Sequence, residues 1–208
     1  MAKRRPYAPR VPKEERRAQV LDAALEVIAR DGYAGVSIDA VAREAGLSRP
    51  VIYGVFDDLG ALLTALLDRQ EKRALAQLMS AIPAVFDPDD IEGLVAGTVR
   101  GMLDAVMSDP LTWRPILAPA DGTPPAVRKR IERDRDLVRQ RIEGLVTTGL
   151  AIRGGAEVDA EVVSHALIGT AEYFGRMVIE EPERIEPERI VATVSALLLA
   201  LAGPSGRD

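Results

Sequence analysis

The sequence predicts an all-α fold of about nine helices. Ala, Leu, Val, Arg and Glu dominate, and aromatic residues make up only 4% of the chain, a composition that favours helix over sheet. Apolar residues recur at spacings of three and four along most of the chain, as on one face of a helix. No segment shows the period-two alternation of a half-buried strand.

The first predicted helix begins near Lys13, after an extended segment, residues 1–12, that contains three prolines. Its apolar residues follow the helical period, and Asp31-Gly32 ends it because glycine accepts the left-handed conformation that often follows a helix. Two short helices follow, 38–45 and 49–55. Ser37 and Ser48 stand at their N-cap positions, and serine is a preferred residue there.

Longer helices fill the rest of the chain, with proline and glycine at their ends. The predicted ranges are 60–82, 88–107, 110–119, 125–148, 157–180 and 187–202. The short helix at 110–119 contains Trp113, the only tryptophan, and is enclosed by prolines.

The segment from Ile38 to Phe56 has the spacing of a helix-turn-helix. Such a motif needs a small residue where the two helices meet, a turn residue that tolerates positive φ, and an aliphatic residue that locks the second helix. Ala42, Gly46 and Ile52 meet these requirements. A plain helical hairpin with a glycine turn is the alternative.

The longer stretch from Arg17 to Leu63 resembles the N-terminal module of TetR-family repressors. The shared features are Ala23-Ala24, Asp31-Gly32-Tyr33, Ser37-Ile38, Ala45-Gly46-Leu47-Ser48, Tyr53 and Phe56. The resemblance implies a three-helix DNA-binding head in residues 1–60 and a helical effector-binding and dimerisation domain in residues 61–208. It also implies a homodimeric repressor that a small, largely apolar molecule releases from double-stranded operator DNA.

The resemblance places the second helix of the motif in the major groove. Arg49 is the candidate for base reading, because its planar guanidinium matches guanine O6 and N7. The two serines and Tyr53 are candidates for phosphate contacts, although capping alone would explain the serines. The predicted DNA-binding residues are Ser37, Ser48, Arg49, Pro50, Val51, Tyr53, Gly54, Arg4 and Arg5.

One position departs from the family. Its members usually carry a phosphate-binding lysine at the start of the next helix, where this chain has Leu59-Gly60 preceded by Asp57 and Asp58. A basic N-terminal arm is one way to replace the lost contact, since minor-groove arms carry such residues. Residues 1–17 contain seven basic and two acidic residues, but a solvated, disordered tail fits the same segment.

The second domain offers candidate binding and association surfaces. The predicted effector-binding residues are Met102, Val106, Trp113, Ile116, Leu117, Val138, Ile142 and His165. Each of the apolar ones also fits a plain core position. The predicted dimer-interface residues are Val163, Leu167, Phe174, Val178, Val191, Val194 and Leu198, on two C-terminal helices that would form a four-helix interface with their symmetry mates.

Composition argues against several other classes of protein. The chain has no cysteine and one histidine, so we expect no disulfide, no metal site, no cofactor and no enzymatic activity. No signal peptide and no apolar run near the ~20 residues of a membrane span are present, which predicts a cytoplasmic protein. A family member that acts as an activator or co-regulator, or a weak DNA binder that works through its effector-binding domain, remains the alternative function.

Overall fold

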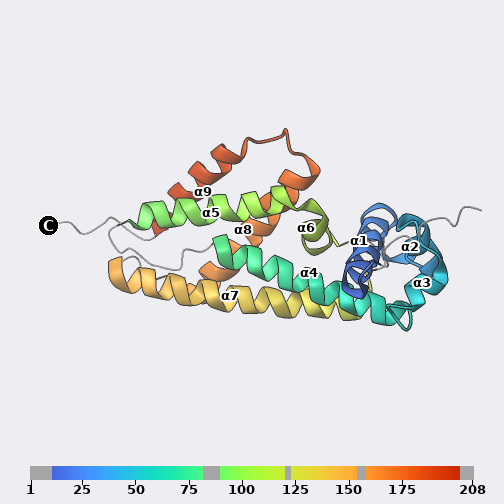
Figure 1. The fold of residues 1–208 in the computed structure, drawn as a ribbon. Helices are drawn as coiled ribbons and strands as arrows, with labels where there is room; N and C mark the ends of the chain where they lie inside the picture. Colours follow the sequence, from blue (N-terminus) through green and yellow to red (C-terminus); the bar gives the residue numbers. More distant parts are fainter. Residues whose placement is uncertain (1–10, 82–89, 120–122, 154–157, 202–208) are drawn as a thin grey trace, which may run out of the picture. The chain divides into compact units, whose positions relative to one another are not determined.

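The computed structural model describes residues 11–81, 90–119, 123–153 and 158–201. These residues form helices and no strand (Figure 1), which confirms the predicted all-α class. The helices are α1 (Lys13–Asp31), α2 (Ile38–Glu44), α3 (Arg49–Tyr53), α4 (Leu59–Ala81), α5 (Ile91–Ser108), α6 (Pro110–Leu117), α7 (Pro125–Arg153), α8 (Ala160–Glu180) and α9 (Pro187–Leu201).

The chain divides into an N-terminal unit, residues 1–68, and a C-terminal unit, residues 69–208. The division falls within α4, eight residues beyond the expected boundary after Gly60. That each unit has a separate function stays a prediction. Among the described helices, none has both the length and the apolar character needed to cross a membrane.

In the N-terminal unit, the apolar face of α1 is the centre of the core. Val20, Ala24 and Val27 on this face are fully buried, as are Val41 of α2 and Ile52 of α3. The beginning of α4 also contributes to this unit, and Leu62 there is fully buried. Burial of a large aliphatic side chain contributes ~1.5–3 kcal/mol, so this core fixes the two short helices that could not be stable alone.

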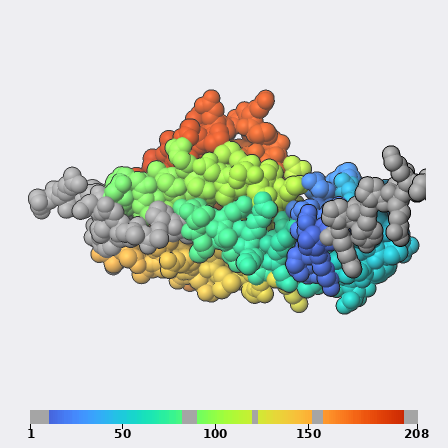
Figure 2. Space-filling view, viewed as in Figure 1, coloured from blue at the N-terminus to red at the C-terminus, as the bar shows by residue number. Residues whose placement is uncertain are grey.

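The C-terminal unit is built around α5, α8 and α9. α9 lies along α5, and α8 packs against α5, α6 and α7 (Figure 1). The surface view shows α5 and α9 next to each other along the same side of this unit (Figure 2). The buried core cluster contains Ala74, Leu103, Val106, Trp113, Val178, Ile190 and Val191.

Three details differ from the sequence prediction. A 3₁₀ turn, Tyr33–Gly35, lies between α1 and α2; a single turn has no periodicity to announce it. α7 continues to Arg153, five residues beyond the predicted end, because Gly149 within it costs only ~1 kcal/mol and does not end a helix. Ser48 occupies the N-cap position of α3, but its side chain makes no capping hydrogen bond.

Candidate nucleic-acid interface

The helix α3 combines one buried anchor with an exposed face. Ile52 is fully buried, whereas Arg49, Pro50, Val51 and Tyr53 are exposed. Because Ile52 already holds α3 against the core, the packing of this helix does not explain why Val51 and Tyr53 are apolar or aromatic. The exposed face is therefore available to a partner.

The turn between α2 and α3 depends on Gly46. Its φ is +65°, in the left-handed region that side chains with a Cβ disfavour. The Gly46 N–H donates to Arg43 O at 3.2 Å, and the Leu47 N–H donates to Ala42 O at 2.8 Å. These two bonds use carbonyls that the end of α2 would otherwise leave unpaired, and they set the direction in which α3 leaves.

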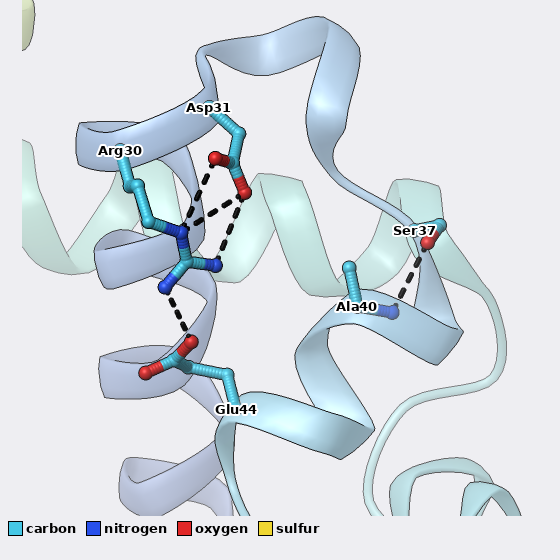
Figure 3. Close-up of polar contacts among 5 residues, drawn as sticks. All are labelled: Arg30, Asp31, Ser37, Ala40 and Glu44. Carbon is cyan, nitrogen blue, oxygen red and sulfur yellow. Dashed lines mark hydrogen bonds and ion pairs between the residues drawn. The ribbon is translucent and has the colours of Figure 1, made fainter.

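The two predicted cap serines differ. Ser37 Oγ accepts a hydrogen bond from Ala40 N at 3.1 Å (Figure 3), which is the capping bond expected for α2. Its own proton can still be donated to an acceptor such as a phosphate oxygen. The exposed hydroxyl of Ser48 has no capping bond to α3. Capping therefore accounts for the presence of Ser37 but not for that of Ser48.

Arg49 is held at the surface by two neighbours. Its Nε lies 3.3 Å from Asp39 Oδ1 on α2. A hydrogen bond to Tyr53, one turn further along α3, and the charge of Asp39 raise the pKa of Arg49 above its ordinary value. The guanidinium is therefore positively charged and contacts both helices of the motif.

Residues of α1 contact the chain just after α2 and just after α3. Gln19 Nε2 donates to Ala45 O at 3.0 Å, and Arg17 Nη1 donates to Val55 O at 3.4 Å. The guanidinium carbon of Arg17 also lies 4.4 Å from the centre of the Phe56 ring, within the range of a cation–π interaction. These contacts were not predicted, and polar residues at 17 and 19 of an amphipathic helix gave no signal for them.

A second connection joins the end of α1 to the end of α2. The Arg30 guanidinium pairs with Asp31 through Nε and Nη2 and with Glu44 through Nη1, the last at 2.7 Å (Figure 3). The hydrogen bonds to Asp31 and then to Glu44 raise the pKa of Arg30. These exposed pairs lie beside an open polar recess that Ser37 and Arg43 also line, and the recess contains both signs of charge.

The segment that replaces the usual lysine has a structural role. Asp58 Oδ1 accepts a hydrogen bond from Ala61 N at 2.7 Å, so Asp58 caps the beginning of α4. Asp57 and Gly60 are exposed. The cap accounts for one of the two aspartates, and no positive side chain takes the place of the lysine in residues 57–60. Arg4 and Arg5, the predicted compensating residues, lie outside the described residues.

The C-terminal unit gathers part of the predicted effector-binding set. Val106 and Trp113 belong to the buried core cluster, and Ile116 and Leu117 pack against it. Met102 and Ile142 are half-buried, and Val138 is buried. His165 lies on the exposed side of α8 and is not with these residues. A Cβ added at Gly175 would lie 2.9 Å from Leu117 Cδ1 and 3.7 Å from Val106 Cγ2, so α8 approaches this cluster closely.

Polar side chains of α4 meet the beginning of α6 beside that cluster. Trp113 Nε1 donates to Gln77 Oε1 at 2.8 Å, and Gln77 Nε2 donates to Asp109 Oδ2 at 3.0 Å. Arg73 Nε lies 2.5 Å from the same Asp109 oxygen. Burial opposes ionisation of Asp109, but hydrogen bonds from Thr112 and Gln77 and the charge of Arg73 outweigh it and lower the pKa of the carboxyl. We call Arg73, Gln77, Asp109, Thr112 and Trp113 the α4–α6 network.

The predicted dimer-interface residues lie mostly on the inner sides of α8 and α9. Val178 and Val191 belong to the buried core cluster, and Phe174 and Val194 pack against it. Val163, Leu167 and Leu198 are half-buried. The apolar residues that these helices expose are different ones: Val162, Tyr173 and Leu197, with 63%, 50% and 63% of their surface accessible.

Comparison with known proteins identifies the N-terminal unit. The family model described as "Bacterial regulatory proteins, tetR family" matches residues 20–66, which begin in α1 and end in α4. The N-terminal part of the chain is therefore similar to that of TetR-family regulators. The matched residues contain α2, α3 and the turn at Gly46, so the family match and the exposed face of α3 concern the same part of the chain.

Curated helix-turn-helix transcriptional regulators are similar to this chain over part of its length. The transcriptional repressor SCO4008 of Streptomyces coelicolor is 35% identical over 82 residues, which are 39% of this chain and 40% of the relative. The transcriptional activator FasR of Mycolicibacterium smegmatis is 29% identical over 123 residues, 59% of this chain and 55% of the relative. The chain thus spans about half the length of the curated relatives it matches.

Solved structures extend the similarity of fold to nearly the whole chain. A TetR-like transcriptional regulator from Rhodococcus superposes with a TM-score of 0.71 at 24% identity, covering 94% of this chain and all of that one. The regulator FadR from Bacillus subtilis, solved in complex with stearoyl-CoA, has a TM-score of 0.68 at 18% identity and covers 88% and 97% of the two chains. At these identities the similarity shows the fold alone.

Proposed function

We propose that this protein is a DNA-binding transcriptional repressor that acts as a homodimer and leaves its operator when a small molecule binds. The observation that carries the proposal is the exposed face of α3. Arg49, Pro50, Val51 and Tyr53 lie on this face, and contacts from α1 and α2 hold it in a fixed orientation. A held helix with a positive charge at its N-terminal end suits the major groove.

Phosphate contacts would come from the residues beside this face. The Ser48 hydroxyl makes no capping bond, and the Ser37 hydroxyl retains a proton to donate. Gly54 is exposed and has no side chain, so it would allow the DNA backbone to approach the end of α3 closely. These contacts would set the position of the unit on DNA, and the side chains of α3 would distinguish sequences.

The direct test is binding of the purified protein to the intergenic DNA upstream of its own gene. The control DNA is a scrambled duplex of the same composition, and both are measured at two salt concentrations, because phosphate contacts weaken as salt rises. We expect tight, salt-dependent binding to the native DNA that Arg49→Ala weakens. Equal binding to both duplexes would contradict the proposal.

We further propose that the exposed sides of α8 and α9 form the dimer interface. The carrying observation is the exposure of Val162, Tyr173 and Leu197, since two recognition helices must be presented at a spacing of ~34–36 Å to read successive turns of DNA. Ala166 and Gly169 are exposed on the same helix α8, and small residues allow two helices to approach closely. Val178 and Val191 support this interface from behind as core residues.

Sedimentation analysis tests the interface. Val162→Glu is expected to convert the dimer to a monomer, because it places a charge within the proposed apolar contact. Met79→Glu is the matched control, since Met79 is an exposed apolar residue of α4 outside the proposed interface. A Val162→Glu protein that remains as dimeric as the control would exclude this face.

The proposed effector site lies near the cluster formed by Val106, Trp113, Ile116 and Leu117, and the proposed effector is largely apolar. Trp113 provides the readout, because it is the only tryptophan of the chain. A compound that releases operator DNA should also change Trp113 fluorescence. Release without any fluorescence change would move the effector site elsewhere.

Activation of transcription is the second candidate function. The relative FasR is named as an activator, and the chain lacks the lysine expected near Leu59. Transcription from the bound promoter in a purified system separates the two functions, because a repressor lowers the transcript level and an activator raises it.

A further inference from the structure

Asp39 and Arg49 form an ion pair on the outer surface of the N-terminal unit. Arg49 Nε lies 3.3 Å from Asp39 Oδ1, and the two side chains are 57% and 59% exposed. An ion pair this exposed adds little to stability. Asp39 also lies in the first turn of α2, where a negative charge favours the helix. That position accounts for a carboxylate at residue 39 but not for its contact with the helix that follows.

The contact uses one particular side of the guanidinium. The atom nearest to Asp39 is Nε, at the base of the fork, so the two terminal nitrogens remain at the far end of the side chain. A guanine presents its O6 and N7 atoms as a pair of acceptors in the major groove, and the two terminal nitrogens of an arginine match that pair. The carboxylate therefore lies beside a nitrogen that this pairing does not need.

We propose that Asp39 is a positioning residue that makes Arg49 selective for a guanine in the operator. This inference rests on the proposed binding of DNA. The carboxylate acts in two ways, both through Arg49. It holds the guanidinium in one orientation before DNA arrives, which reduces the ordering cost of a correct contact.

The second effect acts against wrong contacts. A free arginine binds any phosphate, whereas an arginine paired with Asp39 must give up its partner to do so. The carboxylate itself is repelled by phosphates. Loss of Asp39 should therefore weaken discrimination between bases without weakening attraction to DNA, and specificity that depends on such a repulsive element is a known principle of recognition.

The experiment compares wild-type protein, Asp39→Ala, Arg49→Ala and the double variant. The probes are the native operator, derivatives in which each G·C pair of a half-site is changed to A·T, and a scrambled duplex. For wild-type protein we expect one position where the change weakens binding roughly tenfold or more. Arg49→Ala should abolish that difference, Asp39→Ala should remove most of it, and the double variant should equal Arg49→Ala.

Two controls separate positioning from charge and from folding. Asp57→Ala removes an exposed acidic charge from the same unit without touching Arg49, and it should leave base discrimination unchanged. Asp39→Asn keeps an oxygen that can accept from Nε, so it should keep more discrimination than Asp39→Ala. Binding of Asp39→Ala to the scrambled duplex should stay the same or increase, which a merely damaged protein would not show.

The inference is overturned if Asp39→Ala keeps full discrimination, or if it weakens binding to every duplex by the same factor. It is also overturned if adding Asp39→Ala to Arg49→Ala changes base discrimination in either direction, since Asp39 would then act independently of Arg49. A wild-type protein with no preference for native over scrambled DNA would overturn the proposed function itself. Discrimination at a base pair that does not respond to Arg49→Ala would leave that function intact and remove only this inference.

Discussion

Replacing Asp109 tests how much the α4–α6 network stabilises the C-terminal unit. The carboxylate is buried and accepts a hydrogen bond from Gln77 Nε2 at 3.0 Å, and it also interacts with Thr112 and Arg73. A hydrogen bond to a charged group contributes ~1.5–3 kcal/mol, and a donor left unpaired in the interior adds a cost. Arg73 is more than half exposed, so solvent screens its pairing and we assign it little.

From these contacts we expect Asp109→Ala to lower the free energy of unfolding by about 2–3 kcal/mol. Asp109→Asn keeps an acceptor for Gln77 and should lose about 1 kcal/mol. For a protein of this size, 1 kcal/mol corresponds to roughly 2–4 °C in Tm, so the alanine variant should melt about 4–12 °C lower.

Trp113 fluorescence is the suitable assay, because this single tryptophan donates to Gln77 within the same network. Asp104→Ala is the matched control, since Asp104 is an exposed aspartate of α5. If Asp109→Ala unfolds at the same temperature as that control, the carboxylate does not stabilise the unit and the estimate from its contacts is wrong.

Further outcomes are expected for four individual residues. The fold lowers the pKa of Asp109. The stability that the carboxylate contributes is therefore complete above the unfolded carboxyl pKa of ~3.9 and is lost as pH falls through the lower folded value. The free energy of unfolding of Asp109→Asn should accordingly depend less on pH below ~3.9 than that of the wild type. Gly46→Ala should cost about 1 kcal/mol in urea denaturation, because φ is +65° although a Cβ there meets no atom within 4 Å. Gly97→Ala, equally unobstructed but inside α5, should instead stabilise by about 1 kcal/mol. Arg17→Ala should weaken operator binding while Arg17→Lys recovers part of it, since lysine keeps a cation over the Phe56 ring; equal affinity of both variants and wild type would contradict a positioning role for Arg17.

The sequence was sufficient for the helices because their ends carry local signals. Gly46, with its positive φ, and Ser37, with its capping hydroxyl, stand where the chain turns. These features depend only on residues a few positions apart, so reading along the chain finds them. The 3₁₀ turn at Tyr33–Gly35 escaped because three residues cannot show a period.

The contacts that organise the candidate interface could not be found in the same way. Arg17 reaches the carbonyl of Val55, 38 positions along the chain, and Gln19 reaches Ala45, 26 positions along. Both residues belong to a polar face that would suit solvent equally well. Which carbonyl an exposed side chain meets is decided by how α1 packs on α2 and α3, and that packing exists only after the apolar core has formed.

For the helix α8, the sequence did not show which of two apolar faces is buried in the protomer. Adjacent apolar residues occur in pairs along it, Val162 with Val163 and Tyr173 with Phe174, so apolar periodicity fits two faces that differ by one residue. In the structure the second member of each pair turns inward and the first is exposed. Tyr173 can satisfy its hydroxyl with water on the outer face, whereas Phe174 has no polar group and gains more from burial against the core. In a helix with two apolar faces, the protomer core takes the face without a polar group, which holds Phe174 rather than Tyr173, and Val163 lies on that same face. The face left exposed, with Val162 and Tyr173, is for this reason the better prediction for contact with a second copy of the chain.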